Sequence, residues 1–226
     1  MKTIGLLGGT SWPSTLDYYA TLNRMVGEKL GGFHSAQLIL KSIDYHDIKS
    51  CYGRDWSKVA PLLEKEIHAA LALKPDIFLI CNNTLHKALD ELSIDFGPVQ
   101  LIHMVEETGK EAKAQGYQNI LLLGTKTTME DGAYARKLET FGLTVEIPEL
   151  ADRDLIQTMQ PKLAAGDDPA LYADRFKELL ARYPQYDAVV LACTELPLVV
   201  TEQITTLPIL NPTYLQCRAA VEAALS

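Results

Sequence analysis

Short apolar runs alternate along this chain with longer segments in which apolar residues recur every three or four positions. The apolar runs predict buried strands at residues 3–7, 36–40, 76–80, 99–102, 119–123, 143–147, 188–192 and 207–210. The longer segments predict helices at about residues 15–30, 57–73, 105–115, 129–141 and 168–183, and a short helix that carries His86 and Leu89. Strands and helices that alternate in this way are typical of parallel sheets covered by helices on both faces.

Helix boundaries are marked at two of these segments. Ser14 is a plausible N-cap for the helix at 15–30, and Gly31-Gly32 ends it. Asp168 followed by Pro169 predicts the start of another helix, with the acid as the cap and proline at the first helical position.

One strand with its following turn occurs twice. The first copy runs from Asp76 through Ile-Phe-Leu-Ile to Cys81-Asn82-Asn83-Thr84, and the second runs from Asp187 through Ala-Val-Val-Leu-Ala to Cys193-Thr194-Glu195. Aligning the copies on their aspartates pairs Cys193 with Asn82, and not with Cys81. Because a thiol can carry a proton and a carboxamide cannot, this mismatch bears on any chemistry proposed for the two turns.

The spacing of the repeat predicts two similar halves. Asn82 and Cys193 lie 111 positions apart, and the strand-end threonines Thr10 and Thr125 lie 115 positions apart. We therefore expect an α/β protein with two subdomains. One is formed by residues 1–98 and 209–226, and the other by residues 99–208.

Four polar turns follow strands in this reading, at residues 8–11, 82–84, 124–128 and 193–195. Ligands of open parallel sheets bind beyond the carboxyl ends of the strands, where these turns lie. If the two halves face one another, the turns line a single cleft with pseudo-two-fold symmetry.

Composition excludes several classes of function. The net charge of −8 disfavours binding to nucleic acid or to anionic membranes, and no apolar run in the 226 residues is long enough to span a bilayer. The first nine residues do not resemble a signal peptide, so we expect a cytoplasmic protein with reduced thiols. The four cysteines show no metal-ligand spacing, so no metal site is predicted.

A site built from two matching turns suits stereoinversion at carbon. One group removes a proton from carbon, and a second group delivers a proton from the opposite side. A thiolate suits this task, while backbone N–H groups and hydroxyls at the same turns hold a carboxylate and stabilise an enolate-like intermediate.

The same residues resemble the cofactor-independent aspartate/glutamate racemase family, and in particular its aspartate racemase branch. The resemblance rests on four motifs in order, namely Ile4-Gly-Leu-Leu-Gly-Gly-Thr-Ser-Trp12, Asn83-Thr84-Leu85-His86, Leu122-Leu-Gly-Thr125 with Thr128-Met129, and Ala192-Cys-Thr-Glu195. It covers essentially the whole chain. It implies no cofactor (PLP included), a small amino-acid or dicarboxylate substrate, and a homodimer.

The chain departs from the family pattern at one position. The register set by Asn83, Thr84 and His86 places Asn82 where the family has its first catalytic cysteine. Cys81 then corresponds to a preceding, non-catalytic residue that packs in the core, although a shifted turn would aim it into the site.

The candidate site residues follow from the turns and the resemblance. The candidates for catalysis are Cys193, Asn82 and Glu195, and those for substrate binding are Thr10, Ser11, Tyr52, Asn83, Thr84, Thr125, Thr128 and Thr194. Glu195 either orients or deprotonates the thiol, or faces a helix N-terminus as a capping acid. Tyr52 either reshapes the substrate pocket or is a surface aromatic.

The leading hypothesis is a PLP-independent racemase-type isomerase that acts on aspartate, glutamate or a related amino acid, with Cys193 as one acid/base. The missing thiol at Asn82 leaves three alternatives open. They are a lyase of the decarboxylase type that needs one proton donor, a racemase of impaired or altered specificity, and an amino-acid-binding paralogue without turnover.

Overall fold

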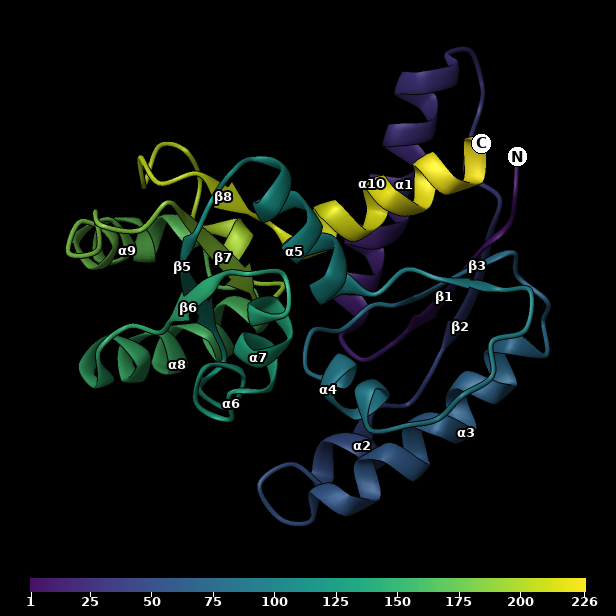
Figure 1. The fold of residues 1–226 in the computed structure, drawn as a ribbon, viewed down its shortest axis with the longest axis horizontal. Coiled ribbons are helices and arrows are strands. Elements are labelled where there is room, and N and C mark those ends of the chain that lie inside the picture. Colours follow the sequence, from purple (N-terminus) through teal and green to yellow (C-terminus); the bar gives the residue numbers. More distant parts are fainter. The chain divides into compact units, whose positions relative to one another are not determined.

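The structure is a computed structural model that describes residues 1–226. The chain forms two compact units, unit 1 with Met1–Met104 and Thr213–Ser226, and unit 2 with Val105–Pro212 (Figure 1). The chain therefore leaves unit 1 once, after Met104, and returns to it at Thr213.

Unit 1 is a parallel four-stranded sheet with helices on both faces. Its strands are β1 (Ile4–Gly8), β2 (Leu38–Ser42), β3 (Ile77–Ile80) and β4 (Gln100–Leu101), in the order β2-β1-β3-β4. Its helices are α1 (Trp12–Leu30), α2 (His46–Ser50), the 3₁₀ turn η1 (Trp56–Lys58), α3 (Val59–Leu71), α4 (Leu85–Asp90) and α10 (Pro212–Leu225).

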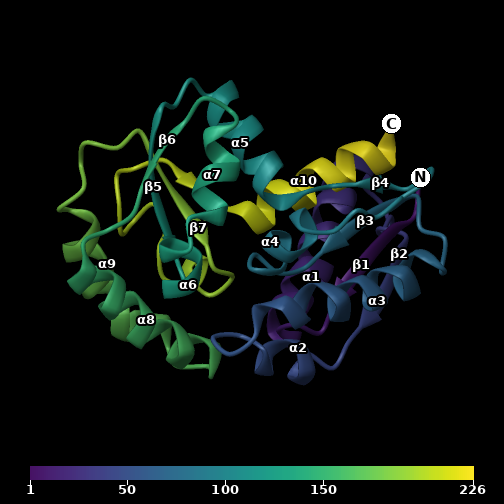
Figure 2. The ribbon, with the colours of Figure 1, turned by 60° about the horizontal axis from the view of Figure 1, so that its bottom comes forward.

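Alternating strand residues divide unit 1 into two apolar layers. Ile4, Leu6 and Leu79 pack with α1 and α10, whereas Leu7 and Phe78 pack with α3 and α4. Figures 1 and 2 show these helix pairs on opposite faces of the sheet. Both faces are buried, which explains why the strands read as continuous apolar runs.

Unit 2 repeats this design. Its strands are β5 (Asn119–Gly124), β6 (Thr144–Glu146), β7 (Ala188–Ala192) and β8 (Ile209–Leu210), in the order β6-β5-β7-β8 and all parallel. Its helices are α5 (Met104–Ala114), α6 (Lys126–Glu130), α7 (Ala133–Glu139), α8 (Leu150–Ala164), α9 (Ala173–Leu180) and the 3₁₀ turns η2 (Pro169–Tyr172) and η3 (Leu196–Leu198). Helices α8 and α9 cover one face of the sheet, and α5 and α7 lie on the other (Figure 2). The prediction of two similar α/β subdomains with parallel sheets is confirmed.

Several predicted helix boundaries were wrong. Helix α1 begins at Trp12 and not at residue 15, because Ser11, and not Ser14, is its N-cap and Pro13 occupies its first turn. The single helix expected at 129–141 is two helices, separated at Gly132 with φ of 71°. The helix expected from Asp168 begins as the 3₁₀ turn η2, with Asp168 as its cap, and continues as α9.

Helices α2, α8 and α10 were not predicted. No helix of the protein has both the length and the apolar character needed to cross a membrane.

Candidate active site

Cys193 follows strand β7 directly, and its side chain is 6% exposed. Its thiol donates a hydrogen bond to Glu195 Oε2 across 2.9 Å. The sequence places the pair two residues apart in a tight turn, so the thiol meets a carboxylate without help from a distant element. A thiol and a carboxylate at this distance can exchange a proton.

The Glu195 carboxylate is held by three donors. Besides Cys193, its Oε2 accepts hydrogen bonds from Thr194 Oγ1 at 3.0 Å and from Gln160 Nε2 of α8 at 3.3 Å. Glu195 stands at the N-cap position of η3, yet its side chain makes no capping hydrogen bond there. Its carboxylate is therefore directed at the thiol, and not at the adjacent helical turn.

The other polar turn of unit 2 begins α6. Thr125 is the N-cap, its Oγ1 accepts from the Thr128 N–H at 3.2 Å, and the two hydroxyl oxygens lie 2.9 Å apart. The next N–H, that of Lys126, donates to Gln157 Oε1 of α8 at 2.8 Å. One face of α8 thus supports both polar turns of unit 2, through Gln157 and Gln160.

In unit 1, Cys81 packs into the core. It is 1% exposed and belongs to the apolar cluster between the sheet and helices α1 and α10, which also contains Cys217. Burial, with a smaller contribution from Cys217, raises the pKa of the Cys81 thiol well above its usual value. A thiol in this environment does not supply a thiolate at neutral pH.

Asn82, the counterpart of Cys193, uses its side chain to hold the turn. Its Oδ1 accepts a hydrogen bond from the Leu85 N–H at 2.9 Å, at the start of α4. Its backbone carbonyl lies 2.7 Å from His86 Nδ1. Both contacts are local, so Asn82 caps the helix that follows it.

Two tyrosines stand beside Asn82. The Tyr45 hydroxyl donates to the Tyr52 hydroxyl at 2.6 Å, and the nearby Asn82 side chain partly offsets the effect of burial on the Tyr45 pKa. Burial raises the pKa of Tyr45 to about 12 and raises the pKa of Tyr52 as well. Both phenols are therefore neutral at physiological pH. Tyr52 also packs on the Trp56 ring at a centroid distance of 5.3 Å, so it is part of an aromatic cluster and not an isolated surface residue.

Thr10 and Ser11 mainly shape the first turn of unit 1. The Thr10 hydroxyl donates to the Cys81 carbonyl at 3.1 Å, and the Ser14 hydroxyl donates to Ser11 Oγ at 2.9 Å. The pair of Ser11 and Ser14 repeats the pair of Thr125 and Thr128, since each joins an N-cap hydroxyl to one three residues later. The structural counterpart of Thr125 is therefore Ser11, and not Thr10.

In these turns, Asn83 is the residue whose side chain has a buried polar atom without a hydrogen-bond partner. The residue is 7% exposed, and its Oδ1 accepts no hydrogen bond. An unpaired amide oxygen in this setting is costly unless a ligand or water binds it. Thr84 next to it is the N-cap residue of α4 but makes no side-chain capping bond.

Comparison with known proteins places this arrangement in a family. The family model for Asp/Glu/hydantoin racemases matches residues 7–222. The chain belongs to this family.

Solved structures of racemase-family proteins share the whole fold. A proposed Asp/Glu racemase from Yersinia pestis is 32% identical over 100% of both chains, with a TM-score of 0.89. An aspartate racemase homologue from Pyrococcus horikoshii OT3 is 25% identical over 100% of both chains, with a TM-score of 0.85. An aspartate racemase from Picrophilus torridus, 21% identical over 99% of this chain and 94% of its own, has the same fold at a TM-score of 0.82.

Three residues beside the polar turns were not found from the sequence. Gln157 and Gln160 lie on α8, a helix that was itself not predicted, and Tyr45 belongs to no repeated or recognisable motif. Their roles depend on packing between segments far apart in the chain. No group of three or more His, Cys, Asp or Glu side chains is arranged to hold a metal ion.

Proposed function

We propose that this protein catalyses proton exchange at the Cα atom of an amino acid with a side-chain carboxylate, such as aspartate or glutamate, without PLP. Cys193 is the proton carrier. The hydrogen bond of 2.9 Å from the Cys193 thiol to Glu195 carries the proposal, because it gives the thiol a built-in proton acceptor. Membership in a racemase family supports the reaction class.

The proton steps balance with these two residues. Transfer of the Cys193 proton to Glu195 Oε2 leaves a thiolate and a neutral carboxylic acid. The thiolate takes the Cα proton, and the electron pair left on Cα is delocalised into the neighbouring carboxylate of the substrate. The hydrogen on sulfur exchanges with solvent, and its return from sulfur to Cα restores the amino acid with a solvent-derived hydrogen. Transfer of the Glu195 proton back to the thiolate restores the enzyme.

Substrate binding is assigned to the polar turns of the two units. In unit 2, Thr194 follows Cys193 directly, and Thr125 and Thr128 follow strand β5, whose last residue Gly124 pairs with Ala192 at the end of β7. The turn of Asn83 and Thr84 offers an amide and a hydroxyl in unit 1. The unpaired Asn83 Oδ1 is suited to accept an N–H of the substrate ammonium group.

Inversion of configuration requires a second proton carrier, and the Asn82 turn offers none of the usual kind. The Asn82 amide does not ionise, the pKa of Cys81 is raised by burial in the core, and the pKa of Tyr45 is raised to about 12. We therefore propose that the wild-type protein exchanges the Cα proton faster than it inverts Cα.

The test measures exchange and inversion together. Purified protein is incubated in D₂O with each enantiomer of aspartate and glutamate, and Cα deuterium and optical purity are followed by NMR and chiral chromatography. We expect deuterium uptake with little loss of optical purity, loss of uptake in Cys193→Ala, and faster inversion in Asn82→Cys. Absence of deuterium uptake from both enantiomers of aspartate and of glutamate would overturn the proposal.

The second candidate function is a one-thiol lyase. The specific observation in its favour is the same absence of a second base, since decarboxylation needs one proton donor: carbon dioxide leaves, and the carbanion takes a proton from Cys193. Release of CO₂ from 2-substituted malonates, lost in Cys193→Ala and without Cα exchange of amino acids, would favour it. Tight amino-acid binding that Cys193→Ala leaves unchanged, with neither reaction, would instead indicate a binding protein.

A further inference from the structure

A buried histidine in unit 1 joins backbone groups from two separate segments. His86 of α4 is 1% exposed. Its Nδ1 lies 2.7 Å from the Asn82 carbonyl oxygen, and the Met104 N–H donates to its Nε2 across 3.2 Å. A backbone N–H can only donate, so Nε2 holds the lone pair and Nδ1 carries the proton that it donates to Asn82.

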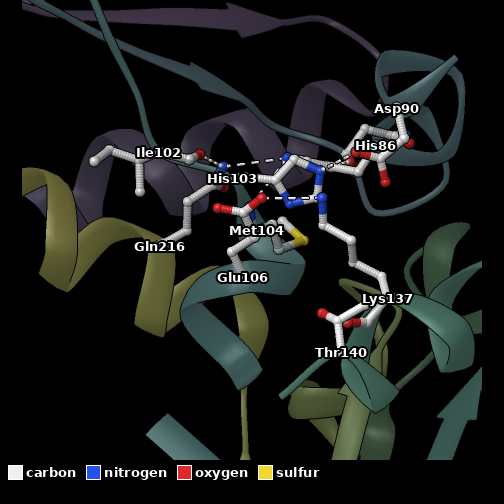
Figure 3. Close-up of polar contacts among 10 residues, drawn as sticks. His86, Asp90, Ile102, His103, Met104, Glu106, Lys137, Thr140 and Gln216 are labelled. Atoms are coloured by element: carbon white, nitrogen blue, oxygen red, sulfur yellow. Dashed lines mark hydrogen bonds and ion pairs between the residues drawn. The ribbon is translucent and has the colours of Figure 1, made fainter. Parts of the chain in front are cut away.

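The same histidine adjoins a second buried residue, Gln216 of α10, which is fully buried. Gln216 Oε1 accepts from the Tyr18 hydroxyl at 2.7 Å, and its Nε2 donates to the Ile102 carbonyl at 2.8 Å and lies 3.5 Å from His86 Nε2. Figure 3 shows the Gln216 amide between the Ile102 carbonyl and the His86 ring.

These contacts coincide with the places where the chain leaves and re-enters unit 1. The chain leaves after Met104, whose N–H is bound to His86, and returns at Thr213, one turn of α10 before Gln216. The His103 ring packs edge-on against His86 at a centroid distance of 4.5 Å, which restrains the orientation of the ring.

We infer that His86 is a positioning residue that ties the Asn82–Thr84 turn to both chain connections of unit 1, as the neutral tautomer with its proton on Nδ1. A histidine that merely filled space would not need a matched acceptor on one nitrogen and a donor on the other. The inference concerns unit 1 itself, and only its kinetic consequence rests on the proposed function.

Three variants separate the two ends of the histidine. His86→Asn keeps a donor near the Nδ1 position but cannot reach Met104. His86→Gln can place an acceptor at the Nε2 position but has no donor at the Nδ1 position. His86→Leu has neither the donor nor the acceptor. Hydrogen exchange of the full chain is measured by NMR at the Met104 amide. The control for unfolding of unit 1 is the Ile4 amide of β1, which donates to the Gln37 carbonyl at 2.9 Å.

We expect Met104 exchange to be at least about tenfold faster in His86→Asn and His86→Leu, since a lost bond of about 1.4 kcal/mol corresponds to that factor, and close to wild type in His86→Gln. The ¹⁵N spectrum of wild-type His86 should show a protonated Nδ1 and an unprotonated Nε2. A protonated Nε2, or equal Met104 exchange in the Asn and Gln variants, would overturn the inference even if His86→Leu does not fold.

The kinetic arm uses Cα deuterium exchange of the preferred amino acid. His86→Gln releases the Asn82 carbonyl and so disturbs the turn with Asn83 and Thr84, whereas Cys193 is untouched. We expect KM to rise about tenfold and kcat to change by less than about threefold. A change in kcat alone contradicts the link to the binding turn. If the wild-type protein exchanges no amino acid, the proposed function fails, while the NMR measurements still decide the role of His86.

Discussion

At the scale of single residues, the thiol of Cys193 is bonded to a carboxylate that is itself held in place. Glu195 accepts hydrogen bonds from Cys193, Thr194 and Gln160 on one oxygen, so its position is determined by a turn and by a helix. A negative charge beside a thiol disfavours the thiolate, yet the same carboxylate provides the path by which the proton leaves. These two effects can be separated by mutation.

Glu195→Gln should change thiol reactivity and catalysis in opposite directions. The amide keeps an oxygen that can accept the S–H bond but removes the charge, so alkylation of Cys193 by iodoacetamide at neutral pH should become about tenfold faster. Cα exchange should slow, because the amide cannot take the proton. Peptide mass spectrometry distinguishes Cys193 from the half-buried Cys51.

Gln160→Leu is the matched control for Glu195→Gln. It removes one donor but keeps the carboxylate, so alkylation of Cys193 should stay within about threefold of wild type. Equal acceleration in both variants would show that packing around the turn, and not the charge of Glu195, controls the thiol.

Asn82 contributes to stability through its bond to the start of α4. Asn82→Ala removes the acceptor of the Leu85 N–H and should lower the free energy of unfolding by about 1 kcal/mol, measured by urea denaturation. Asn82→Asp keeps an acceptor there and should cost less. Asn83→Ala is the control, because no hydrogen bond to Asn83 Oδ1 is lost. A larger loss in Asn83→Ala than in Asn82→Ala would contradict this assignment.

At the scale of elements, the repeated aspartates have a structural role. Asp76 Oδ2 accepts the Thr3 N–H at 2.7 Å, and Asp187 Oδ2 accepts the N–H groups of Gln118 and Asn119 at 2.8 Å each. Each acid thus caps the start of the central strand beside its own strand. The duplicated acid reflects a duplicated sheet, and not a duplicated catalytic group.

Asp187→Asn should lower the free energy of unfolding at neutral pH and should also make that free energy depend less on pH. Hydrogen bonds from the backbone of Asn119 and Gln118 lower the pKa of Asp187. A lowered native pKa stabilises the fold above the unfolded-state pKa, and this stabilisation is lost as pH falls through the native pKa. The Asn variant should therefore be less stable than wild type at neutral pH but lose less stability on acidification to about pH 3.

The control for Asp187→Asn is Glu202→Gln, which changes the same charge in an exposed turn of the same unit. Chemical denaturation at both pH values is the measurement. An equal acid dependence in Asp187→Asn and wild type would show that other carboxylates account for it.

The strands could be predicted from the sequence because both sheet faces are buried, which makes the strands short apolar runs. Helix α8 could not be predicted, because its start has no side-chain cap and its last turn contains Pro161. Its residues Ile156, Met159 and Leu163 nevertheless face the core. Because α8 was not predicted, Gln157 and Gln160 could not be predicted to contact the site. The pairing of Cys193 with Asn82 followed from the repeat alone, whereas the cap made by Asn82 needed side-chain geometry.

The first turn of each unit shows a further limit of sequence alignment. Strands β1 and β5 both end in glycine, at Gly8 and Gly124, but unit 1 then has the additional Gly9. Gly9 has φ of +84°, and a Cβ there would lie 2.3 Å from the Ile43 carbonyl oxygen. Gly9 and Thr10 thus place two residues between the strand and its cap in unit 1, whereas Thr125 follows Gly124 directly. This is why Thr10 aligned with Thr125 in the sequence although Ser11 is the corresponding cap.

At the scale of the whole molecule, each unit has its own sheet and its own buried core. Phe176 of α9 is fully buried in the core of unit 2, and Phe78 of β3 is fully buried in unit 1. Both tryptophans, Trp12 and Trp56, belong to unit 1. Tryptophan fluorescence therefore reports on unit 1, whereas far-ultraviolet circular dichroism reports on the helices of both units.

These facts predict that the two units can be destabilised separately. Phe176→Ala should cost about 3–5 kcal/mol in unit 2, so in urea the circular dichroism should begin to fall before the tryptophan fluorescence changes. Phe78→Ala is the matched variant of unit 1. In it the fluorescence transition should be complete before the circular dichroism transition, because the helices of unit 2 remain folded. If fluorescence and circular dichroism shift together in both variants, the two units unfold as one cooperative body, and the separate cores do not confer separate stability.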